Sequence, residues 1–409
     1  MIFRYIKLAW RNLFRNKRRS FIAGTAIGIG LASLIFTDAL IIGMDENMVG
    51  SATGSFLGEG QIFHEDFKTS RSAEYTVENY KKILKKLEKE EIVENFAPRV
   101  EALAMISSAS EVKSASMVGI KPSKEQYMSK IDDAITKGSY FKDSNKRDIV
   151  IGYRLAELLG VGLGDRIVVT VSQAETGDLS QELFRVSGIF NLNIKEMDRG
   201  MVFVRIDKAQ EMLNINDNVH IISINFTSTK YGRNKKLPFW AKYSQGKNEA
   251  QGWVELMPQL ATALKLSNFS SYIVGVILFG IVALVIINTL FMSLYERIFE
   301  FGVLKSVGTR PFGIFQLILY EAGSLSILSI FLGIILGIII LWITSATGID
   351  YTGIEYAGVT FTEKIYPIAK FKQFVIYPFW VFVFTLIAGI YPAVHAAKIN
   401  PADALRKSM

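Results

Sequence analysis

Residues 295–308 read YERIFEFGVLKSVG, a short charged segment that lies between two long apolar runs of the chain. Apolar residues recur within it at every third or fourth position, which predicts an amphipathic helix of about three turns. Arg297 and Glu300 are three residues apart and can pair on the polar side of that helix. Gly308, followed by Pro311, predicts where the helix ends. A helix of this length is too short to form a domain, and its patterning indicates a surface that another protein contacts.

The overall composition lies between that of a soluble protein and that of a protein embedded fully in a membrane. The chain has 409 residues, of which 50% are hydrophobic and 21% are charged. This balance predicts a soluble domain attached to a few membrane spans. There is no cysteine, which excludes disulfides, thiolate metal sites and a thiol nucleophile. The histidines are far apart in the sequence, so we expect no metal site; they are His64, His220 and His395.

The formal net charge of +8 is concentrated in short segments next to the apolar runs. Residues 1–20 contain seven Lys or Arg and no acid, whereas residues 44–270 carry 30 basic and 30 acidic residues. Residues 295–314 and the C-terminal tail are also net positive. Cytoplasmic segments next to membrane spans carry such an excess, so we expect 295–314 and both termini in the cytoplasm. A nucleic-acid partner is not expected, because the large polar part of the chain is electrically balanced.

Four apolar runs are long enough to cross a bilayer as helices. We expect these spans at 21–43, 271–294, 315–345 and 372–394, joined by a cytoplasmic segment at 295–314 and a periplasmic loop at 346–371. The remaining parts are a basic amphipathic helix at 1–20, a periplasmic domain at 44–270 and a cytoplasmic tail at 395–409. A signal peptide does not explain the N-terminal end, because the apolar run there is too long and lacks a clear cleavage site. The predicted fold class is an α-helical membrane protein of four transmembrane helices with a large periplasmic α+β domain.

Pairs of glycines four residues apart occur in the first and third spans, namely Gly24 with Gly28 and Gly333 with Gly337. This spacing predicts a face on which another helix packs closely. A membrane helix also tolerates glycine without such a contact, so the sequence leaves both interpretations open.

One acid lies inside each of the same two apolar runs. Asp38 is about one turn from the outer end of the first span, where an interfacial position and a buried functional acid are both open interpretations. Glu321 is about two turns from the inner end of the third span, where its carboxylate can reach the interface or bond to a neighbouring helix.

The predicted periplasmic domain has the alternating patterns of an α+β fold. We expect a helix at 76–94 and another at Tyr153–Leu159 that ends at Gly160. Strands are expected at 102–107, 115–120, 149–151, 167–171, 183–189, 201–204 and 221–226. The segment 173–181 lies between two strand patterns and predicts a protruding hairpin tip. The polar segment 227–252 is expected to be an exposed loop or a contact with a partner.

The motifs of common catalytic sites are absent from the sequence. There is no G-x-x-x-x-G-K-[ST] for phosphate binding, no G-x-S-x-G and no H-E-x-x-H. The acids of 44–270 are mixed with lysines, as they are on solvated surfaces. We therefore expect a protein that is not an enzyme, that binds no cofactor of its own, and that transmits work done by a separate protein.

Four stretches of the chain together resemble the FtsX-like permease superfamily of ABC systems. They are RNLFRNKRRSFI at 11–22, YERIFEFGVLKSVG at 295–308, EAGSLSILSIFLGIILG at 321–337 and YPAVHAAKINPADALR at 391–406. Within that superfamily, the outer domain resembles the lipoprotein-releasing, or Lol-type, permeases. The matching residues are GIKP at 119–122, IVIGYRLAELLGVGLGDRIVV at 149–169, VSQ and SQELFRVSGIF within 171–190, and GWVELMPQLATALKL at 252–266.

The resemblance implies a MacB-like periplasmic domain of two subdomains, porter and sabre. It also implies a cytoplasmic ABC ATPase dimer that docks on the segment 295–314, which is then a coupling segment. ATP and magnesium are then used by the ATPase, and the substrate does not pass through a pore. Carried over to this sequence, the coupling residues are Arg297, Glu300, Phe301, Gly302, Lys305 and Gly308. A second permease subunit, identical or paralogous, is implied as well.

The tip at 173–181 corresponds in position to the hook by which Lol-type permeases recruit a periplasmic lipoprotein carrier. Its candidate docking residues are Gln173, Glu175, Gly177, Asp178 and Gln181. The tip is short and acidic and lacks the prolines common in that hook. The alternative that this chain is the subunit facing the substrate therefore stays open.

The implied function is to extract acylated lipoproteins from the outer leaflet of a bacterial inner membrane and pass them to the carrier. Extraction must replace lipid with other apolar surface, which we expect between the first and second spans. The candidate cavity residues are Ile35, Phe36, Leu40, Val276, Phe279 and Ile287. An ordinary lipid-facing helix explains the same apolar residues of the second span.

Two other functions remain open, a MacB-like export permease for peptides or small molecules and FtsX-like signalling to a cell-wall hydrolase. Membrane lipid is a further expected partner, because a basic amphipathic helix at 1–20 suits the headgroup layer.

Overall fold

The computed structural model describes residues 8–11, 17–141, 146–356, 359–361 and 363–400. The chain divides into two compact units, each assembled from separate stretches of sequence. The membrane unit comprises Met1–Asp45, Lys265–Asp350 and Lys364–Met409, and the sheet unit comprises Glu46–Leu264 and Tyr351–Glu363. The basic helix expected at 1–20 and the tail expected at 395–409 lie partly outside the described residues.

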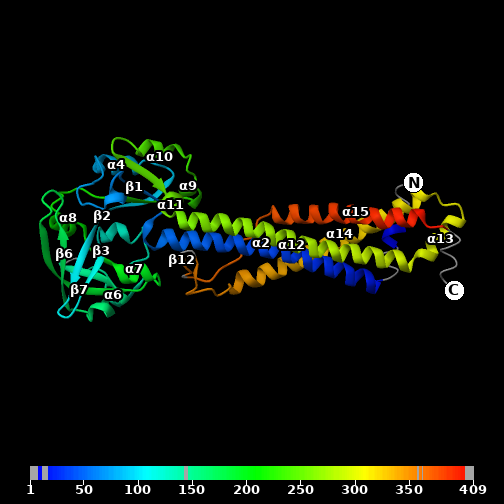
Figure 1. The fold of residues 1–409 in the computed structure, drawn as a ribbon, viewed down its shortest axis with the longest axis horizontal. Coiled ribbons are helices and arrows are strands. Elements are labelled where there is room, and N and C mark those ends of the chain that lie inside the picture. The colour runs from blue at the N-terminus through cyan, green and yellow to red at the C-terminus, as the bar shows by residue number, and fades with distance from the viewer. Residues whose placement is uncertain (1–7, 12–16, 142–145, 357–358, 362, 401–409) are drawn as a thin grey trace. The chain divides into compact units, whose positions relative to one another are not determined.

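Four long helices run through the membrane unit, and each is long and apolar enough to cross a membrane (Figure 1). They are α2 (Lys17–Ala52), α12 (Pro258–Glu296), α14 (Pro311–Thr347) and α15 (Gln373–Lys398), with α13 (Ile298–Ser306) between α12 and α14. The predicted four spans are therefore confirmed, although the helices extend beyond them. The 36 residues of α2 form about 54 Å of helix, against roughly 30 Å of hydrocarbon. The extension is possible because a helix satisfies its backbone hydrogen bonds internally, in lipid and in water alike.

Glycine lets the backbones of α2 and α14 approach closely. A Cβ added at Gly28 would lie 3.1 Å from the Gly333 nitrogen, and one added at Gly333 would lie 2.8 Å from the Gly28 carbonyl oxygen. Gly24 and Gly337 lie in the same seam, each next to side chains of the facing helix. The glycine spacing thus marks a helix–helix contact, which is one of the two interpretations that the sequence left open.

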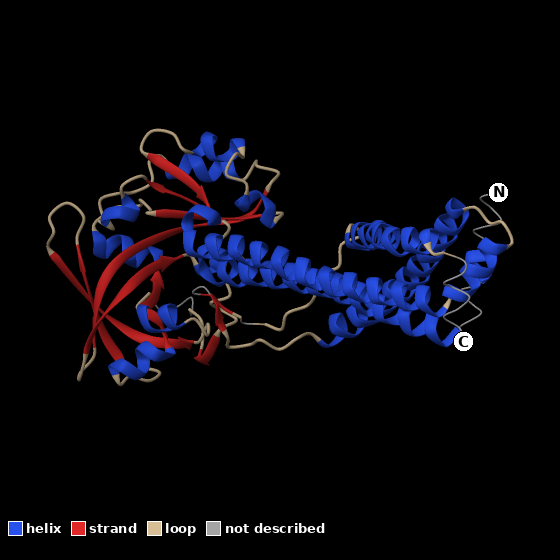
Figure 2. Cartoon of the chain, turned by 45° about the vertical axis from the view of Figure 1, so that its right-hand side comes forward, coloured by secondary structure: helices blue, strands red, loops and turns tan. Residues whose placement is uncertain are grey.

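A ten-stranded sheet organises the sheet unit (Figure 2). Its path is β10-β1-β9-β2-β3-β8-β5-β7-β4, and β6 pairs with β2 and β7. The strands are β1 (Gly60–His64), β2 (Val93–Ser107), β3 (Val112–Ile120), β4 (Ile135–Gly138), β5 (Asp148–Gly152), β6 (Arg166–Ser172), β7 (Leu179–Phe190), β8 (Met201–Arg205), β9 (Ile221–Phe226) and β10 (Asn248–Gly252). The first part of β2 pairs with β9, and its second part pairs with β3 and β6. The long strand β2 therefore joins two groups of strands, in keeping with the two subdomains that the resemblance implies.

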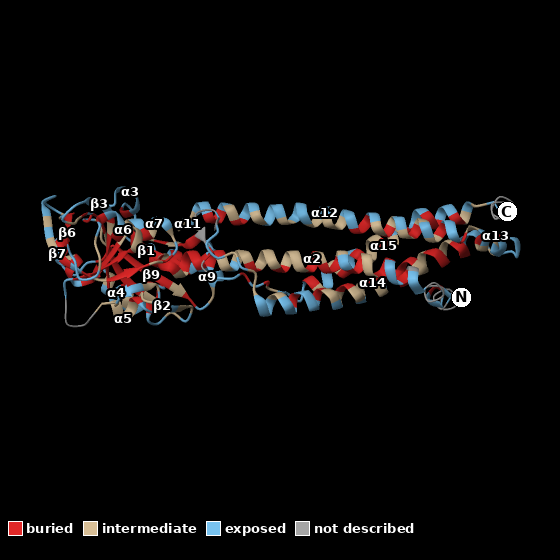
Figure 3. Cartoon of the chain, turned by 90° about the horizontal axis from the view of Figure 1, so that it is seen from below, coloured by how far each residue is buried: buried red, intermediate tan, exposed pale blue. Residues whose placement is uncertain are grey.

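Short helices cover the sheet, and the largest core cluster lies between them and the strands. They are α3 (Phe67–Ser70), α4 (Tyr80–Leu87), α5 (Pro122–Glu125), α6 (Tyr153–Leu159), α7 (Lys195–Gly200), α8 (Ile206–Leu213), α9 (Thr229–Arg233), α10 (Pro238–Tyr243) and α11 (Trp253–Leu256). A small antiparallel pair, β11 (Glu355–Tyr356) and β12 (Val359–Thr360), also belongs to this unit. Figure 3 shows buried residues throughout the sheet, whereas much of α12 is exposed, as expected for a helix that faces lipid.

The strand predictions are confirmed, since all seven predicted strands lie within β2, β3 and β5–β9. The helix at Tyr153–Leu159 also ends as expected, with Gly160 in the left-handed conformation at a φ of +64°. Three strands of the ten-stranded sheet were missed, namely β1, β4 and β10. Each is only four or five residues long, and β10 reads NEAQG, which has no alternation of apolar residues.

Two predictions for the sheet unit are wrong. The helix expected at 76–94 is too long, because α4 is short and Val93 already pairs with β9. The segment 227–252 is not an exposed loop, since it forms α9, α10 and β10. Its aromatic residues Phe239 and Trp240 are 4% and 6% exposed and belong to the main core. In both cases pairing with distant strands overrides the local polarity of the sequence.

A buried arginine fixes the turn that follows α2 to the sheet. Arg99 on β2 is 1% exposed and donates to both carboxylate oxygens of Glu125, at 2.6 and 3.1 Å. Its Nη1 donates to the Phe56 carbonyl oxygen at 2.5 Å and to Ser223 Oγ at 2.7 Å. Phe56 lies in the π-helical turn Thr53–Leu57, which continues directly from α2. The buried charge is thus paired and hydrogen-bonded, the condition under which such a charge is tolerated.

Candidate functional site

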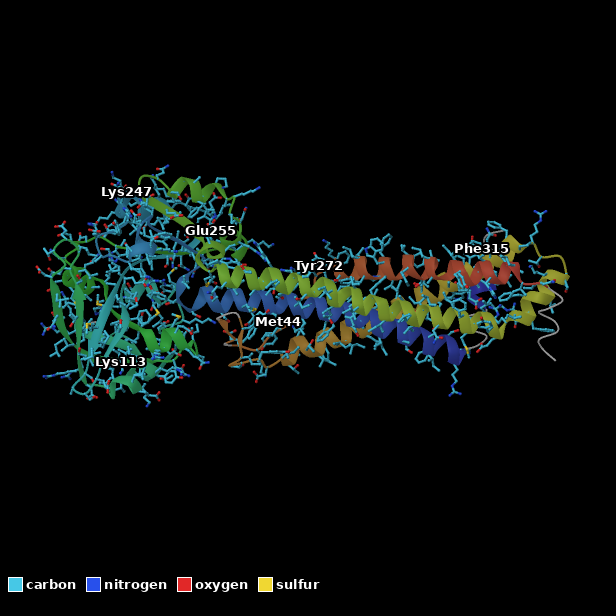
Figure 4. The ribbon with its side chains drawn as sticks, in the orientation of Figure 1. Met44, Lys113, Lys247, Glu255, Tyr272 and Phe315 are labelled. Carbon is cyan, nitrogen blue, oxygen red and sulfur yellow. The ribbon has the colours of Figure 1, made fainter. Side chains whose placement is uncertain are left out.

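A cavity of about 710 Å³ opens between α2, α12 and α15, and all of its lining residues belong to the membrane unit. We call it the Asp38 cavity. Its walls are mainly apolar and include Leu34, Ile41, Ile42, Val276, Phe279, Ile376 and Trp380. Tyr272, which Figure 4 labels on α12, lines the same cavity. A space of this size with apolar walls is typical of a ligand site.

The polar groups of the Asp38 cavity come from α2, from the first half of α12, and from the start of α15 with the residues just before it. Gln373 is 4% exposed, and its Nε2 donates to Asp38 Oδ2 at 2.7 Å. The Gln373 Oε1 accepts from the Lys370 backbone nitrogen at 2.9 Å, and the Tyr377 hydroxyl is a further hydrogen-bond partner of Asp38. The exposed Lys370 and Lys372 also line the cavity. The arrangement suits a molecule that has apolar chains and a polar head.

The six residues predicted to line a substrate cavity lie in different places. Val276 and Phe279 line the Asp38 cavity. Four do not: Ile35, Phe36, Leu40 and Ile287. Ile35 is fully buried and faces α14, while Ile287 borders a separate hollow along α12. Substrate contact by any of the six stays a prediction.

The sequence analysis missed the contribution of α15, which supplies Gln373, Tyr377 and Trp380. Asp38 was the available signal, because a carboxylate inside an apolar run requires a hydrogen-bond partner on another element. The sequence does not show which partner, since Gln373 is 335 residues away. Among the described residues, no group of three or more His, Asp or Glu is placed to hold a metal ion.

Close contact between α2 and α12 divides the space between them. A Cβ added at Gly30 would overlap the side chain of Val282, which is 3% exposed. Along the helices, the Asp38 cavity lies on one side of this contact. On the other side lies a hollow of about 830 Å³, which we call the Lys17 groove. It is lined by Lys17, Arg18, Ile22, Ala23, Ala26, Val285, Asn288, Thr289, Met292 and Glu296.

The segment between α12 and α14 is anchored by one arginine. Arg297 Nε donates to Glu300 Oε2 at 2.9 Å, as predicted, and its Nη1 donates to Glu321 on α14. The Arg297 side chain is 7% exposed, and its guanidinium lies 5.2 Å from the centroid of the Phe301 ring. Glu321 therefore bonds to a neighbouring segment instead of reaching the interface. This cluster fixes the start of α13 against α14.

The six residues assigned to coupling divide into a buried and an exposed group. The buried ones are Arg297, Phe301 and Gly302. Lys305 is tied to the end of α15, where its Nζ donates to the Ile399 carbonyl oxygen at 2.7 Å. Glu300 is partly exposed, and Gly308 is exposed at a φ of +95°. The buried side chains position α13, and its outward face is mainly apolar, with Phe299, Val303 and Leu304 on the helix and Val307 directly after it. ATPase contact by the segment stays a prediction.

A turn at 173–178 joins β6 to β7, which confirms the predicted hairpin. The Gln173 nitrogen donates to the Asp178 carbonyl oxygen at 2.8 Å, and Gly177 closes the turn at a φ of +70°. Glu175, Gly177 and Asp178 are exposed at its tip. Gln181, which was assigned to the tip, instead lies within β7 and pairs with β6. Docking of a carrier here stays a prediction.

Models of two protein families match the chain. The model of the MacB-like periplasmic core domain matches residues 20–231, and the model of the FtsX-like permease C-terminal region matches residues 272–401. The first match alone covers more than half of the 409 residues.

Curated relatives match along most of the chain at low identity. The lipoprotein-releasing system transmembrane protein LolC of Xylella fastidiosa is 24% identical over 323 residues, covering 76% of this chain and 77% of the relative. The lipoprotein-releasing system transmembrane protein LolE of Haemophilus influenzae is 22% identical over 399 residues, covering 93% of each chain.

Two solved structures are similar to part of the chain. The periplasmic region of MacB from Actinobacillus actinomycetemcomitans has a TM-score of 0.35 at 10% identity, covering 49% of this chain and 92% of that one. The extracellular domain of the ABC-type transporter YknZ from Gram-positive bacteria has a TM-score of 0.32 at 15% identity, covering 47% of this chain and 97% of that one.

Proposed function

Because the chain belongs to the FtsX-like ABC transporter permease superfamily and carries a MacB-like periplasmic core domain, we propose that it is a permease subunit that extracts lipoproteins from the outer leaflet of a bacterial inner membrane. In this proposal the lipoprotein passes to a periplasmic carrier, and a separate cytoplasmic ATPase supplies the work. At such low identity, the LolC and LolE relatives support the class of permease more firmly than they support the substrate. The observation that carries the proposal is the Asp38 cavity, with its apolar walls and polar groups.

The energetics of extraction explain why such a cavity is needed. At about 0.8 kcal/mol per buried methylene, three acyl chains with roughly 45 methylenes hold a lipoprotein in the bilayer by about 35 kcal/mol. Release therefore requires apolar surface at each stage and an energy source. The apolar walls between α2, α12 and α15 offer such surface, and the cavity polar groups suit the glycerol and peptide end of the substrate.

In this proposal the ATPase dimer docks on the outward face of α13, in the cytoplasm with both chain termini. ATP and magnesium act in that partner, and this chain binds no cofactor. A second permease subunit, identical or paralogous, completes the transporter. The exposed tip of the β6–β7 hairpin is the proposed contact for the carrier, through Glu175, Gly177 and Asp178.

The test uses two glycines of α12 that differ only in position. A Cβ added at Gly275 or at Gly280 meets no atom within 4 Å, but only Gly275 lines the Asp38 cavity. Gly275→Trp therefore fills the cavity, and Gly280→Trp is the matched control. The full chain is purified with its ATPase, reconstituted in liposomes, and assayed for ATP hydrolysis with and without a triacylated lipopeptide. We expect the lipopeptide to raise turnover severalfold in the parent protein and in Gly280→Trp, but not in Gly275→Trp.

A parent protein that does not respond to any acylated substrate would refute lipoprotein extraction. The second candidate is a MacB-like export permease, favoured by the family match over residues 20–231. Stimulation by a periplasmic adaptor protein and a peptide, with no response to lipopeptide, would select it. Capture of a cell-wall hydrolase by the full chain, again with no response to lipopeptide, would select FtsX-like signalling instead.

A further inference from the structure

The Lys17 groove has a charged mouth and a mainly apolar wall. Lys17 and Arg18 are both exposed at the start of α2, and among the described residues no acid pairs with either. Beyond them, Ile22, Ala26 and Val285 line the groove toward its closed end. We propose that this groove binds one anionic phospholipid from the leaflet at the α13 end of the membrane unit, with its phosphate at the two cations and an acyl chain along the wall.

The depth of the groove fits a single leaflet. Its α12 wall runs from Glu296 at the mouth to Val285, a distance of about 16 Å along the helix. One leaflet contributes about half of the roughly 30 Å hydrocarbon core. At its inner end the groove is closed where Val282 meets Gly30. An acyl chain can therefore lie in the groove over its full depth, and it stops near the middle of the bilayer.

The composition of the lining distinguishes a lipid from a protein occupant. Among the described residues of the lining, charged side chains occur only at the mouth, where Lys17 and Arg18 outnumber one acid, Glu296. The deeper wall is apolar except for Asn288 and Thr289, which are neutral. A phospholipid has the same division, a charged group at one end and hydrocarbon below it. Each Lys or Arg near the surface favours an anionic headgroup, which gives the groove its selectivity.

Small side chains leave the room that the lipid fills. Ala23 and Ala26 form the α2 wall, and the hollow of about 830 Å³ lies within the usual range of ligand pockets, roughly 300–1,000 Å³. A larger side chain at Ala26 would occupy the groove without touching the cations. Charge and space can therefore be tested separately.

The experiment measures lipid retained by the full-length protein. The protein is reconstituted in nanodiscs that contain equal amounts of phosphatidylglycerol and phosphatidylcholine. It is then transferred into detergent, and the mass of the protein with its retained lipid is measured by native mass spectrometry. We expect one retained phosphatidylglycerol per chain, preferred about tenfold over phosphatidylcholine, because the two cations favour a headgroup with net negative charge and the choline group makes phosphatidylcholine neutral overall. Lys17→Ala with Arg18→Ala should abolish the preference, and Ala26→Phe should abolish retention of both lipids.

The matched control is Arg310→Ala with Lys398→Ala, which removes two exposed cations that do not line the groove. This variant should retain phosphatidylglycerol as the parent does. Equal loss in the control, or unchanged retention in the Lys17 and Arg18 variant, would overturn the proposal in favour of general lipid binding around the protein. A change in oligomeric state on Ala26→Phe, without retained lipid in the parent, would show that a second protein chain fills the groove.

This inference does not depend on the substrate of the transporter. The measurement needs neither the ATPase nor a lipoprotein, so its failure would leave the proposed function untouched. In the same way, a parent protein that ignores lipopeptide could still retain phosphatidylglycerol.

Discussion

Gly28 on α2 and Gly333 on α14 face each other so closely that a Cβ on Gly333 would lie 2.8 Å from the Gly28 carbonyl oxygen. The two backbones therefore lie close together, and dispersion between them replaces side-chain packing. In a bilayer this matters because the hydrophobic effect does not drive one apolar helix against another.

We expect Gly333→Val to separate α2 from α14 and to destabilise the membrane unit by about 1–3 kcal/mol, the usual cost of overpacking. Thermal unfolding of the detergent-solubilised protein, followed by size-exclusion chromatography, measures the effect. Gly280→Val is the control, because a Cβ at Gly280 meets no neighbouring atom. The same melting temperature for both variants would show that the close contact of α2 and α14 contributes nothing to the stability of the membrane unit.

The apolar surface of α13 and of Val307, which directly follows it, predicts how the proposed ATPase partner is held. Val307 is 81% exposed, and a charge at this position leaves the fold intact but opposes burial in an apolar contact. We expect Val307→Asp to weaken binding of the ATPase at least tenfold, the equivalent of about 1.4 kcal/mol. Binding is measured by titrating the purified ATPase onto the permease in nanodiscs. Phe371→Asp changes another highly exposed apolar residue, outside α13, and should bind as the parent does.

The pair formed by Arg297 and Glu321 predicts a strong coupling between two substitutions. Arg297→Met alone leaves the Glu321 carboxylate, which is 12% exposed, without its cation, and we expect a loss of stability of about 3–5 kcal/mol. Arg297→Met with Glu321→Gln removes both charges and should recover most of that loss. Unfolding of the two single variants and the double variant completes the cycle. Additive losses would show that the two side chains act independently.

His220 makes the stability of the sheet unit depend on pH. It is fully buried, its Nδ1 accepts from the Glu101 nitrogen, and its Nε2 lies 2.9 Å from the Ala73 carbonyl oxygen. Burial lowers its pKa from 6.5 to about 4. The unfolded chain therefore takes up a proton at higher pH than the folded chain does. Stability is complete above about pH 6.5 and falls as the pH drops toward 4.

The size of that loss is about 3 kcal/mol at most, from the difference between the two pKa values. Urea unfolding of the full chain in detergent between pH 4 and 7.5, followed by tryptophan fluorescence, measures it. His220→Gln should flatten this part of the pH profile while lowering stability at neutral pH. A profile with the same slope in the variant would exclude His220 as its cause.

The four long apolar helices and the short helix α13 could be predicted because their signals are local. An apolar run of sufficient length identifies a span wherever it lies, and 295–308 carries its own helix pattern and its own stop at Gly308. The pairing of Arg297 with Glu300 is local in the same way. Which side of α13 is buried is not local, because α14 and the end of α15 determine it.

The cavity and the ends of several strands depend on contacts between distant parts of the chain. The bond from Gln373 to Asp38 and the bond from Arg99 to the Phe56 carbonyl oxygen both join residues far apart in sequence. The start of β2 has a polar, helix-like sequence, and only its pairing with β9 makes it a strand. The local polarity and periodicity of the sequence do not predict which distant segment is the partner.

The contact between Gly30 and Val282 interrupts the furrow between α2 and α12. A continuous furrow from one membrane face to the other would let water, ions and headgroups leak across. Val282 closes the seam in mid-course, next to the fully buried Ile27 and Ile286. In the proposed function, the Asp38 cavity takes up and releases the substrate on its own side of this contact, and the seam stays closed to water and ions. Extraction as proposed would therefore leave the ion gradient and the lipid asymmetry of the bilayer intact.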